Sequence, residues 1–137
     1  MSDQQEMHRG SCACGAVRFQ TTGTLRPVIA CHCGQCRKSL TNYGAFTAVD
    51  RGGLVLEGED AVTWYDSSPG VRRGFCRRCG SNLFWDYAAK AQISIAAGAF
   101  DQPSGLRQQC HIFVADKADF YEIGDGLKQL PQGSGGS

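Results

Sequence analysis

Three cysteines fall within six residues of the sequence, in the stretch Cys31-His32-Cys33-Gly34-Gln35-Cys36-Arg37. Thiols so close together do not suit an ordinary disulfide framework, whereas a tight turn can aim several thiolates at one soft metal ion such as Zn²⁺. A closed zinc site uses four protein ligands, so three would leave one coordination position for a substrate. The trio of Cys31, Cys33 and Cys36 is therefore the candidate reaction centre.

Two further cysteine pairs, far apart in the sequence, form a quartet: Cys12, Cys14, Cys76 and Cys79. Gly15 and Gly80 directly follow the pairs, as glycines do in zinc-binding turns. Four thiolates close a tetrahedral zinc site and leave no position for a substrate. Such a site would tie an N-terminal loop to a turn in the middle of the chain and stabilise the fold. The alternative is a set of reduced, buried thiols without metal.

Spacing alone leaves the grouping of the ligands open. The trio could exchange ligands with the quartet, or Cys110 or His32 could complete a second closed site. We expect His32, which lies between two ligands, to point away from the metal that they share. Cys110 enters an apolar stretch, and we expect a small buried side chain there.

An open site with three thiolates favours thiol chemistry over hydrolysis. Three thiolates already neutralise the ion, and this weakens its ability to acidify a bound water. A substrate thiol suits such a site better, because zinc would hold it as the reactive thiolate at neutral pH. The trio thus predicts attack of a sulfur on a carbonyl, or the reverse cleavage of a carbon–sulfur bond.

Composition predicts one mainly β domain to position these ligands. The chain has 137 residues and 18 glycines, with β-branched runs and few helical patterns. Strands are expected over residues 16–21, 43–49, 54–57, 62–65, 71–75, 82–85, 93–97 and 111–114. The strand 54–57 is expected to form a hairpin with 43–49 across a turn at 51–53, and residues 34–40 a short helical turn. Residues 1–9 read as a polar leader and 131–137 as a flexible tail, which leaves 10–130 as the domain.

Charge and cysteine usage limit the classes of partner. The formal net charge is +1 with 20% charged residues, which counts against nucleic acid and anionic membranes. Eight cysteines without an apolar leader predict a reducing compartment, and we expect the cytoplasm. No apolar run approaches the length that a bilayer requires. We expect small-molecule partners and leave a homodimer open.

The cysteine motifs, in their order and spacing, resemble the glutathione-dependent formaldehyde-activating enzyme family, whose relatives include centromere protein V. The matching segments are residues 10–17, 31–37, 67–81 and 111–114, within a resemblance that runs from about 10 to 123. The resemblance implies a single-domain β-tent fold built from small antiparallel sheets. It implies a structural zinc on the quartet and a catalytic zinc on the trio. It also implies glutathione as co-substrate, which adds to formaldehyde to give S-hydroxymethylglutathione.

Five other residues are candidates for substrate contact: Arg37, Ser67, Ser68, Arg72 and His111. The paired N–H donors of an arginine suit the carboxylates of glutathione, although the arginines around Cys76 and Cys79 fit a solvated basic face as well. The two serines could bond a ligand or simply form the turn. The histidine could carry a proton near neutral pH or be a satisfied core residue.

The sequence therefore predicts a zinc-dependent carbon–sulfur lyase that adds glutathione or a similar thiol to a small carbonyl such as formaldehyde, or runs the reverse reaction. The alternative is a non-catalytic zinc module for protein or nucleic acid, which the arginines near Cys76 keep open. A third reading is metal-free redox chemistry at Cys33 and Cys36, whose spacing allows a disulfide.

Overall fold

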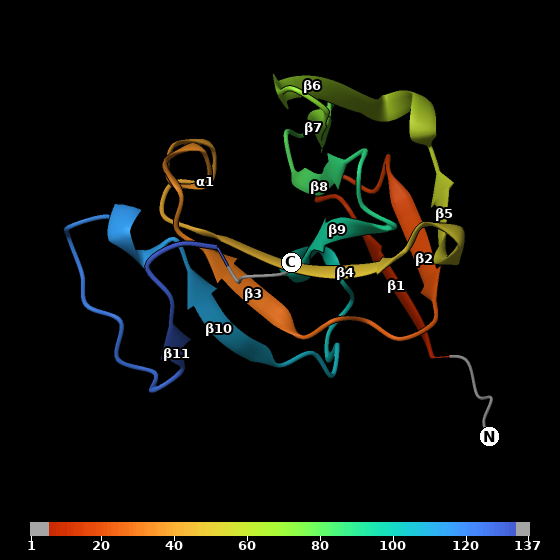
Figure 1. Cartoon of the computed structure of the whole chain (residues 1–137). Coiled ribbons are helices and arrows are strands. Elements are labelled where there is room, and N and C mark those ends of the chain that lie inside the picture. Colours follow the sequence, from red (N-terminus) through yellow and green to blue (C-terminus); the bar gives the residue numbers. More distant parts are fainter. Residues whose placement is uncertain (1–5, 134–137) are drawn as a thin grey trace. The chain divides into compact units, whose positions relative to one another are not determined.

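The structure is a computed structural model that describes residues 6–133, and within this range the protein is mainly β, as predicted (Figure 1). The chain forms two compact units. The described part of the first unit comprises residues 6–26 and 47–105, and that of the second comprises 27–46 and 106–133. The quartet belongs to the first unit and the trio to the second.

The first unit contains two antiparallel arrangements of strands. One is a three-stranded sheet in the order β1 (Met7–Ser11), β2 (Arg18–Thr22), β5 (Leu54–Glu57). The other runs in the order β9 (Gln92–Ala96), β8 (Asn82–Tyr87), β7 (Val71–Cys76), β6 (Val62–Ser68). Short 3₁₀ turns are η1 (Arg51–Gly53), η2 (Glu59–Ala61) and η3 (Ala97–Ala99).

Buried and more exposed side chains alternate along β2, so that one face of its sheet packs on the core of the unit. Phe19 and Thr21 are buried, while Arg18 is exposed, as the period of a half-buried strand predicts. The Phe19 ring meets Phe84 of β8 at 6.1 Å and Phe100 at 5.1 Å between centroids, both edge-on. Aromatic pairs of this geometry add to the free energy gained by burying the rings.

The second unit is organised around β10 (Gln108–Ile112). Its other elements are β3 (Val28–Cys31), α1 (Gly34–Ser39), η4 (Val114–Asp116) and β11 (Lys128–Gln129). The strand β4 (Gly44–Asp50) begins in this unit, where it pairs antiparallel with β3, and ends in the first. The strand β10 pairs in parallel with both β3 and β11, which departs from the expected antiparallel sheets. A long stretch of chain separates β3 from β10, so no hairpin turn forces them antiparallel.

The predicted hairpin between residues 43–49 and 54–57 is wrong. The strand β5 pairs with β2, because η1 turns the chain away from β4. Gly53 allows this path, since a Cβ at Gly53 would lie 2.2 Å from the backbone oxygen of Thr22. The turn signal at 51–53 was real, but it did not specify which strand the next segment would join.

Parts of the predicted leader and tail lie within the described residues. The strand β1 begins at Met7, inside the predicted leader of residues 1–9, and pairs with β2. Within the predicted tail, Gln132 accepts a hydrogen bond from the Phe113 N–H at 2.8 Å. Residues 134–137 of that tail, and 1–5 of the leader, lie outside the described residues.

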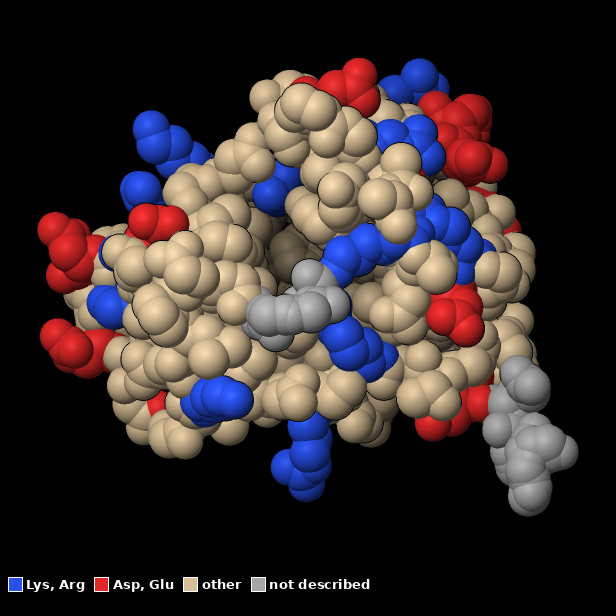
Figure 2. All heavy atoms as spheres, viewed as in Figure 1, with Lys and Arg blue, Asp and Glu red and all other residues tan. Residues whose placement is uncertain are grey.

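Surface charge is mixed in sign. On the face shown in Figure 2, acidic and basic side chains are interspersed, in keeping with the formal net charge of +1. None of the helices within residues 6–133 has the length and hydropathy that a bilayer crossing requires.

Gly53→Ala should lower the free energy of unfolding by about 2 kcal/mol, because the added methyl group meets a rigid backbone oxygen. Gly52→Ala is the matched control, since a Cβ there meets nothing within 4 Å. Urea denaturation of both variants measures the difference. Equal stability of the two variants would show that the close approach of η1 to β2 is not required.

Candidate metal centres and active site

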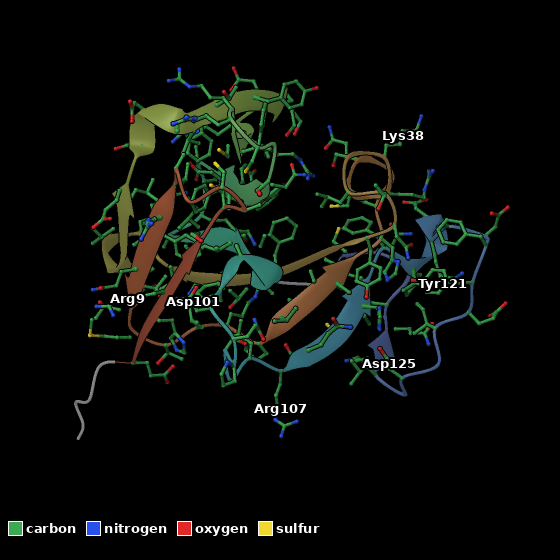
Figure 3. All side chains as sticks on the ribbon, turned by 180° about the vertical axis from the view of Figure 1, so that it is seen from behind. Arg9, Lys38, Asp101, Arg107, Tyr121 and Asp125 are labelled. Atoms are coloured by element: carbon green, nitrogen blue, oxygen red, sulfur yellow. The ribbon has the colours of Figure 1, made fainter. Side chains whose placement is uncertain are left out.

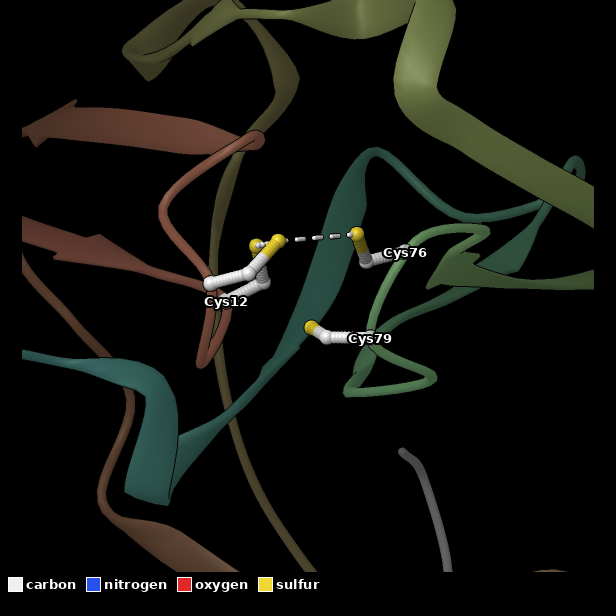
Figure 4. A group of neighbouring side chains, drawn as sticks. Cys12, Cys76 and Cys79 are labelled. Carbon is white, nitrogen blue, oxygen red and sulfur yellow. Dashed lines mark hydrogen bonds between the residues drawn. The ribbon is translucent and has the colours of Figure 1, made fainter.

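The quartet brings its four sulfur atoms within 4.8 Å of one another (Figure 4). The Sγ of Cys14 lies 3.7 Å from that of Cys12 and 3.8 Å from that of Cys76. A tetrahedral zinc ion with Zn–S bonds of about 2.3 Å requires sulfurs about 3.8 Å apart. The spacing and the chemistry of the donors therefore both fit a zinc ion.

Two tight turns aim these sulfurs. In the loop between β1 and β2, the Val17 N–H donates to the Sγ of Cys12 at 3.3 Å. In the turn after β7, the Arg78 N–H donates to the Sγ of Cys76 at 3.3 Å. That turn closes through Gly80, whose φ of 80° is favourable for glycine. Backbone donors directed at sulfur are the kind of support that orients metal ligands.

Local hydrogen bonds favour the ionised thiols of Cys79 and Cys12. At Cys14 the backbone hydrogen bond at Ala16 is outweighed by burial and the neighbouring thiols, which raise the pKa of Cys14 to about 11. The Ser81 hydroxyl and backbone N–H lower the pKa of Cys79 to about 5. Burial raises the pKa of Cys12, but hydrogen bonds from the Val17 N–H and the neighbouring thiols outweigh it, so that this pKa is lowered. Thiolates are the form in which cysteine binds metal.

The trio forms a second, separate group, with its three sulfur atoms also within 4.8 Å of one another. Cys31 ends β3, Cys33 is the N-cap of α1, and Cys36 lies buried in the helix. The Sγ of Cys33 accepts a hydrogen bond from the Cys36 N–H at 3.4 Å. The strand end and the first helical turn thus aim three sulfurs at one point.

This geometry decides between the groupings that the spacing left open. Quartet and trio exchange no ligands, and among the described residues neither Cys110 nor His32 belongs to either group. Cys110 is 6% exposed, as expected of a small buried side chain. The His32 ring bonds His111 at 2.9 Å, and its nitrogens are not part of the trio's group.

Hydrogen bonds within the trio concentrate negative charge on one sulfur. The thiols of Cys31 and Cys36 lower the pKa of Cys33 to about 2, and the bond between Cys31 and Cys33 raises the pKa of Cys31. The Cys33 thiolate already attracts the protons of its two neighbouring thiols. A divalent ion would replace those protons, so these three sulfurs suit a divalent ion.

Of the predicted substrate contacts, Arg37 and His111 belong to the trio's unit. The Nε of Arg37, in α1, donates to the Asp116 backbone oxygen at 3.3 Å. His111 is 3% exposed, and its two ring nitrogens bond His32 and Asp125. This favours the reading of His111 as a satisfied core histidine.

Ser67, Ser68 and Arg72 belong to the quartet's unit. Arg72 donates from Nε to Asp86 Oδ2 at 3.0 Å, and its guanidinium carbon lies 3.8 Å from the centroid of the Trp64 ring. The Ser67 hydroxyl bonds the Val71 backbone oxygen at 3.5 Å. An open cavity of about 560 Å³ is lined by Asp66, Ser68, Pro69, Gly70, Val71, Arg72, Asp86 and Ala88.

Sequence reasoning missed Tyr121 and Asp125, which contact the two histidines. The Asp125 Oδ2 lies 2.7 Å from His111 Nε2, and the Tyr121 hydroxyl lies 3.4 Å from His32 Nδ1. Both residues follow the last predicted strand, in a segment with neither periodicity nor cysteine spacing. In the sequence, His111 itself was the one signal, because a histidine in the core needs hydrogen-bond partners.

Comparison with known proteins adds a decisive finding. A family model described as "Glutathione-dependent formaldehyde-activating enzyme" matches residues 7–116, which include both cysteine groups. The chain belongs to this family.

The chain is also similar to named relatives, and their names are consistent with its membership of this formaldehyde-activating enzyme family. A Halomonas elongata protein, provisionally named a glutathione-dependent formaldehyde-activating enzyme, is 30% identical over 128 residues, covering 83% of this chain and 79% of the relative. An uncharacterized lyase of Schizosaccharomyces pombe is 28% identical over 118 residues, covering 85% of each chain. A Rhodobacter sphaeroides crystal structure shares the fold, with a TM-score of 0.57, 18% identity and coverage of 89% of this chain and 98% of that one.

Cys76→Ser should release metal from the quartet and lower the melting temperature by roughly 10 °C or more, because metal binding contributes directly to folding free energy. Cys110→Ala is the control, since that cysteine is buried but lies outside both groups. Metal analysis and thermal unfolding measure the effects. If the Cys76 variant kept its metal and its melting temperature, the quartet would not be a structural site.

Asp86→Asn should lower the free energy of unfolding by about 1–2 kcal/mol at pH 7. Burial raises the pKa of Asp86, but hydrogen bonds from Arg51 and Arg72 outweigh it and lower that pKa. The stabilisation is therefore present above the unfolded value of about 3.9 and is lost as the pH falls through the folded pKa. The gap between wild type and variant should narrow at acid pH. Asp101→Asn, at an exposed position, should show no such gap.

Proposed function

We propose that this protein is a zinc-dependent carbon–sulfur lyase. It joins the thiol of glutathione, or of a similar molecule, to a small carbonyl such as formaldehyde, and it catalyses the reverse cleavage. The observation that carries the proposal is the convergence of three cysteine sulfurs in a chain of the glutathione-dependent formaldehyde-activating family. The lyase name of the yeast relative supports the same reaction class.

The two cysteine groups have different roles because they offer different numbers of ligands. The quartet supplies four thiolates and holds a structural zinc. The trio of Cys31, Cys33 and Cys36 supplies three and holds the catalytic zinc, with a fourth position for the substrate thiol. Zinc bound there would keep that thiol in its thiolate form at neutral pH.

The reaction balances without an oxidant or reductant. A bond forms between the thiol sulfur and the carbonyl carbon, and the carbonyl oxygen takes up a proton equivalent to the one that the thiol releases. The reverse reaction breaks the same carbon–sulfur bond and returns the proton to sulfur. The chain's own contribution is to hold three ligands at one point and to orient the substrate.

Arg37 is the proposed contact for a glutathione carboxylate. It directly follows the ligand Cys36 on α1, and its Nε anchors it to the Asp116 backbone oxygen. A guanidinium carries further N–H donors that suit a carboxylate. Substrate contacts by Ser67, Ser68 and Arg72 stay a prediction, since these residues belong to the first unit.

The free cysteines of both groups favour a reducing compartment such as the cytoplasm.

Glutathione should enter the metal coordination of the trio. Co²⁺-loaded protein should show sulfur-to-metal charge-transfer bands that grow saturably as glutathione is added, because each bound molecule contributes a thiolate. S-methylglutathione, which has no thiol, is the matched control ligand and should leave the bands unchanged. Bands that ignore glutathione while two tetrahedral sites are occupied would argue for a closed second site and a non-catalytic module.

The same ligand set should govern catalysis. Cys33→Ser should lower the rate of glutathione–formaldehyde adduct formation, followed by nuclear magnetic resonance with ¹³C-formaldehyde, by at least about tenfold. Cys110→Ala should keep the wild-type rate. An active Cys33 variant would remove the trio from the mechanism.

A further inference from the structure

A chain of hydrogen bonds within the second unit includes His32, the residue between Cys31 and Cys33 of the trio. The Nε2 of His32 is 2.9 Å from the Nδ1 of His111, and the Nε2 of His111 is 2.7 Å from the Oδ2 of Asp125. Both imidazoles are buried, with His32 0% and His111 3% exposed, whereas the Asp125 side chain is 41% exposed. The chain thus runs from a solvated carboxylate to a fully buried ring.

The carboxylate sets the direction of every bond in this chain. An ionised Asp125 can only accept, so His111 must carry its proton on Nε2. With both rings neutral, the Nδ1 of His111 is then an acceptor and takes the proton of His32 Nε2. The Nδ1 of His32 is left to accept from the Tyr121 hydroxyl, at a longer 3.4 Å.

The surroundings hold the His32 ring in place. The ring of Tyr43 packs against it at 4.8 Å and that of Tyr121 at 6.4 Å between centroids. With His111 bonded at Nε2 and Tyr121 near Nδ1, the packed ring has one permitted orientation.

His32 connects this chain to the ligands because it lies between Cys31 and Cys33. Its backbone N–H donates to the Ile112 backbone oxygen at 2.9 Å, and its side chain bonds His111. Both partners belong to β10, so main chain and side chain attach the middle of the ligand segment to one strand. A displacement of the His32 backbone would also move the two flanking cysteines, since they are its neighbours in the chain.

Asp125 is itself held in place. Its Oδ1 accepts the Leu127 N–H at 2.9 Å, just before β11 pairs with β10. Figure 3 shows Tyr121 and Asp125 on the segment beside β10 and β11. This segment follows residue 116, where the match to the family model ends.

We propose that Asp125 and His111 are positioning residues that fix the orientation of His32 and thereby the relative placement of Cys31 and Cys33. The role rests on the proposed function, because it assumes that the trio binds metal. It assigns to the C-terminal segment a part in the metal centre although that segment supplies no ligand. The carboxylate at the outer end of the hydrogen-bond chain leaves a single arrangement of protons within it.

Asp125→Asn tests this role, because an amide of the same size can donate as well as accept and so permits the opposite direction. Co²⁺ affinity of the trio should fall about tenfold, as is typical when a residue that orients metal ligands is changed. The quartet's affinity should not change. Glu122→Gln removes a neighbouring exposed carboxylate and should leave both affinities at the wild-type value. Competition with a chelator measures both sites, and Cys33→Ser protein identifies the quartet's contribution.

A second measurement separates positioning from general stability. In zinc-loaded wild type, long-range ¹H–¹⁵N spectra should show His32 and His111 both protonated at Nε2. Asp125→Asn should replace this single pattern by a mixture of tautomers, and Glu122→Gln should not.

The outcomes distinguish this inference from the proposed function. A wild-type trio that binds no Co²⁺ overturns the proposed function and the positioning role with it. A trio that binds Co²⁺ equally well in wild type and Asp125→Asn, with unchanged tautomers, overturns the positioning role alone. The positioning role is also overturned if Asp125→Asn lowers the Co²⁺ affinity of the trio and the quartet equally. It is overturned as well if Glu122→Gln lowers the trio's affinity as much as Asp125→Asn does.

Discussion

The arrangement of this protein depends on holding several cysteine sulfurs close enough together for one metal ion to bind them all. The quartet joins a loop at residues 12–14 to a turn at 76–79. The Cys14 sulfur lies 3.7 Å from the Cys12 sulfur and 3.8 Å from the Cys76 sulfur. Thiolates at this distance repel each other unless a cation lies between them. The hydrogen bonds from Val17 and Arg78 offset part of that repulsion, and a zinc ion would offset the rest. The strands of the first unit serve to present these two turns.

The trio meets the same constraint with one ligand fewer, and it relies more heavily on its surroundings. Its three cysteines come from a single short segment, where β3 ends and α1 begins. Among the described residues, no distant segment adds a further ligand atom to this group, so its geometry depends on one short segment. The parallel pairing of β10 with β3, and the buried contact between His32 and His111, support that segment from the neighbouring strand. On the proposed function, a three-ligand site would gain from neighbouring residues that orient its ligands.

On the proposed function, one group contributes stability and the other chemistry. The same ligand type occurs in both, but four sulfurs saturate zinc whereas three leave a position for a substrate thiol. Membership of the formaldehyde-activating family agrees with this division. The Tyr121–Asp125 segment lies beyond the family match, so the support behind the trio is provided by a part of the chain that the family model does not describe.

The grouping of the ligands came from the tertiary structure, whereas the amino-acid sequence by itself determined the candidate ligand turns, the mainly β class and the helical turn at the trio. These features are local: cysteine spacing and a following glycine set which sulfurs a turn can aim together, and alternation along β2 set its buried face. Tertiary structure alone decided that β5 joins β2, that β10 runs parallel to β3, and that Asp125 meets His111. Each of these depends on which distant segments approach each other. A turn signal or an isolated acidic residue carries no information about its distant partner, because that choice follows from the packing of the whole unit.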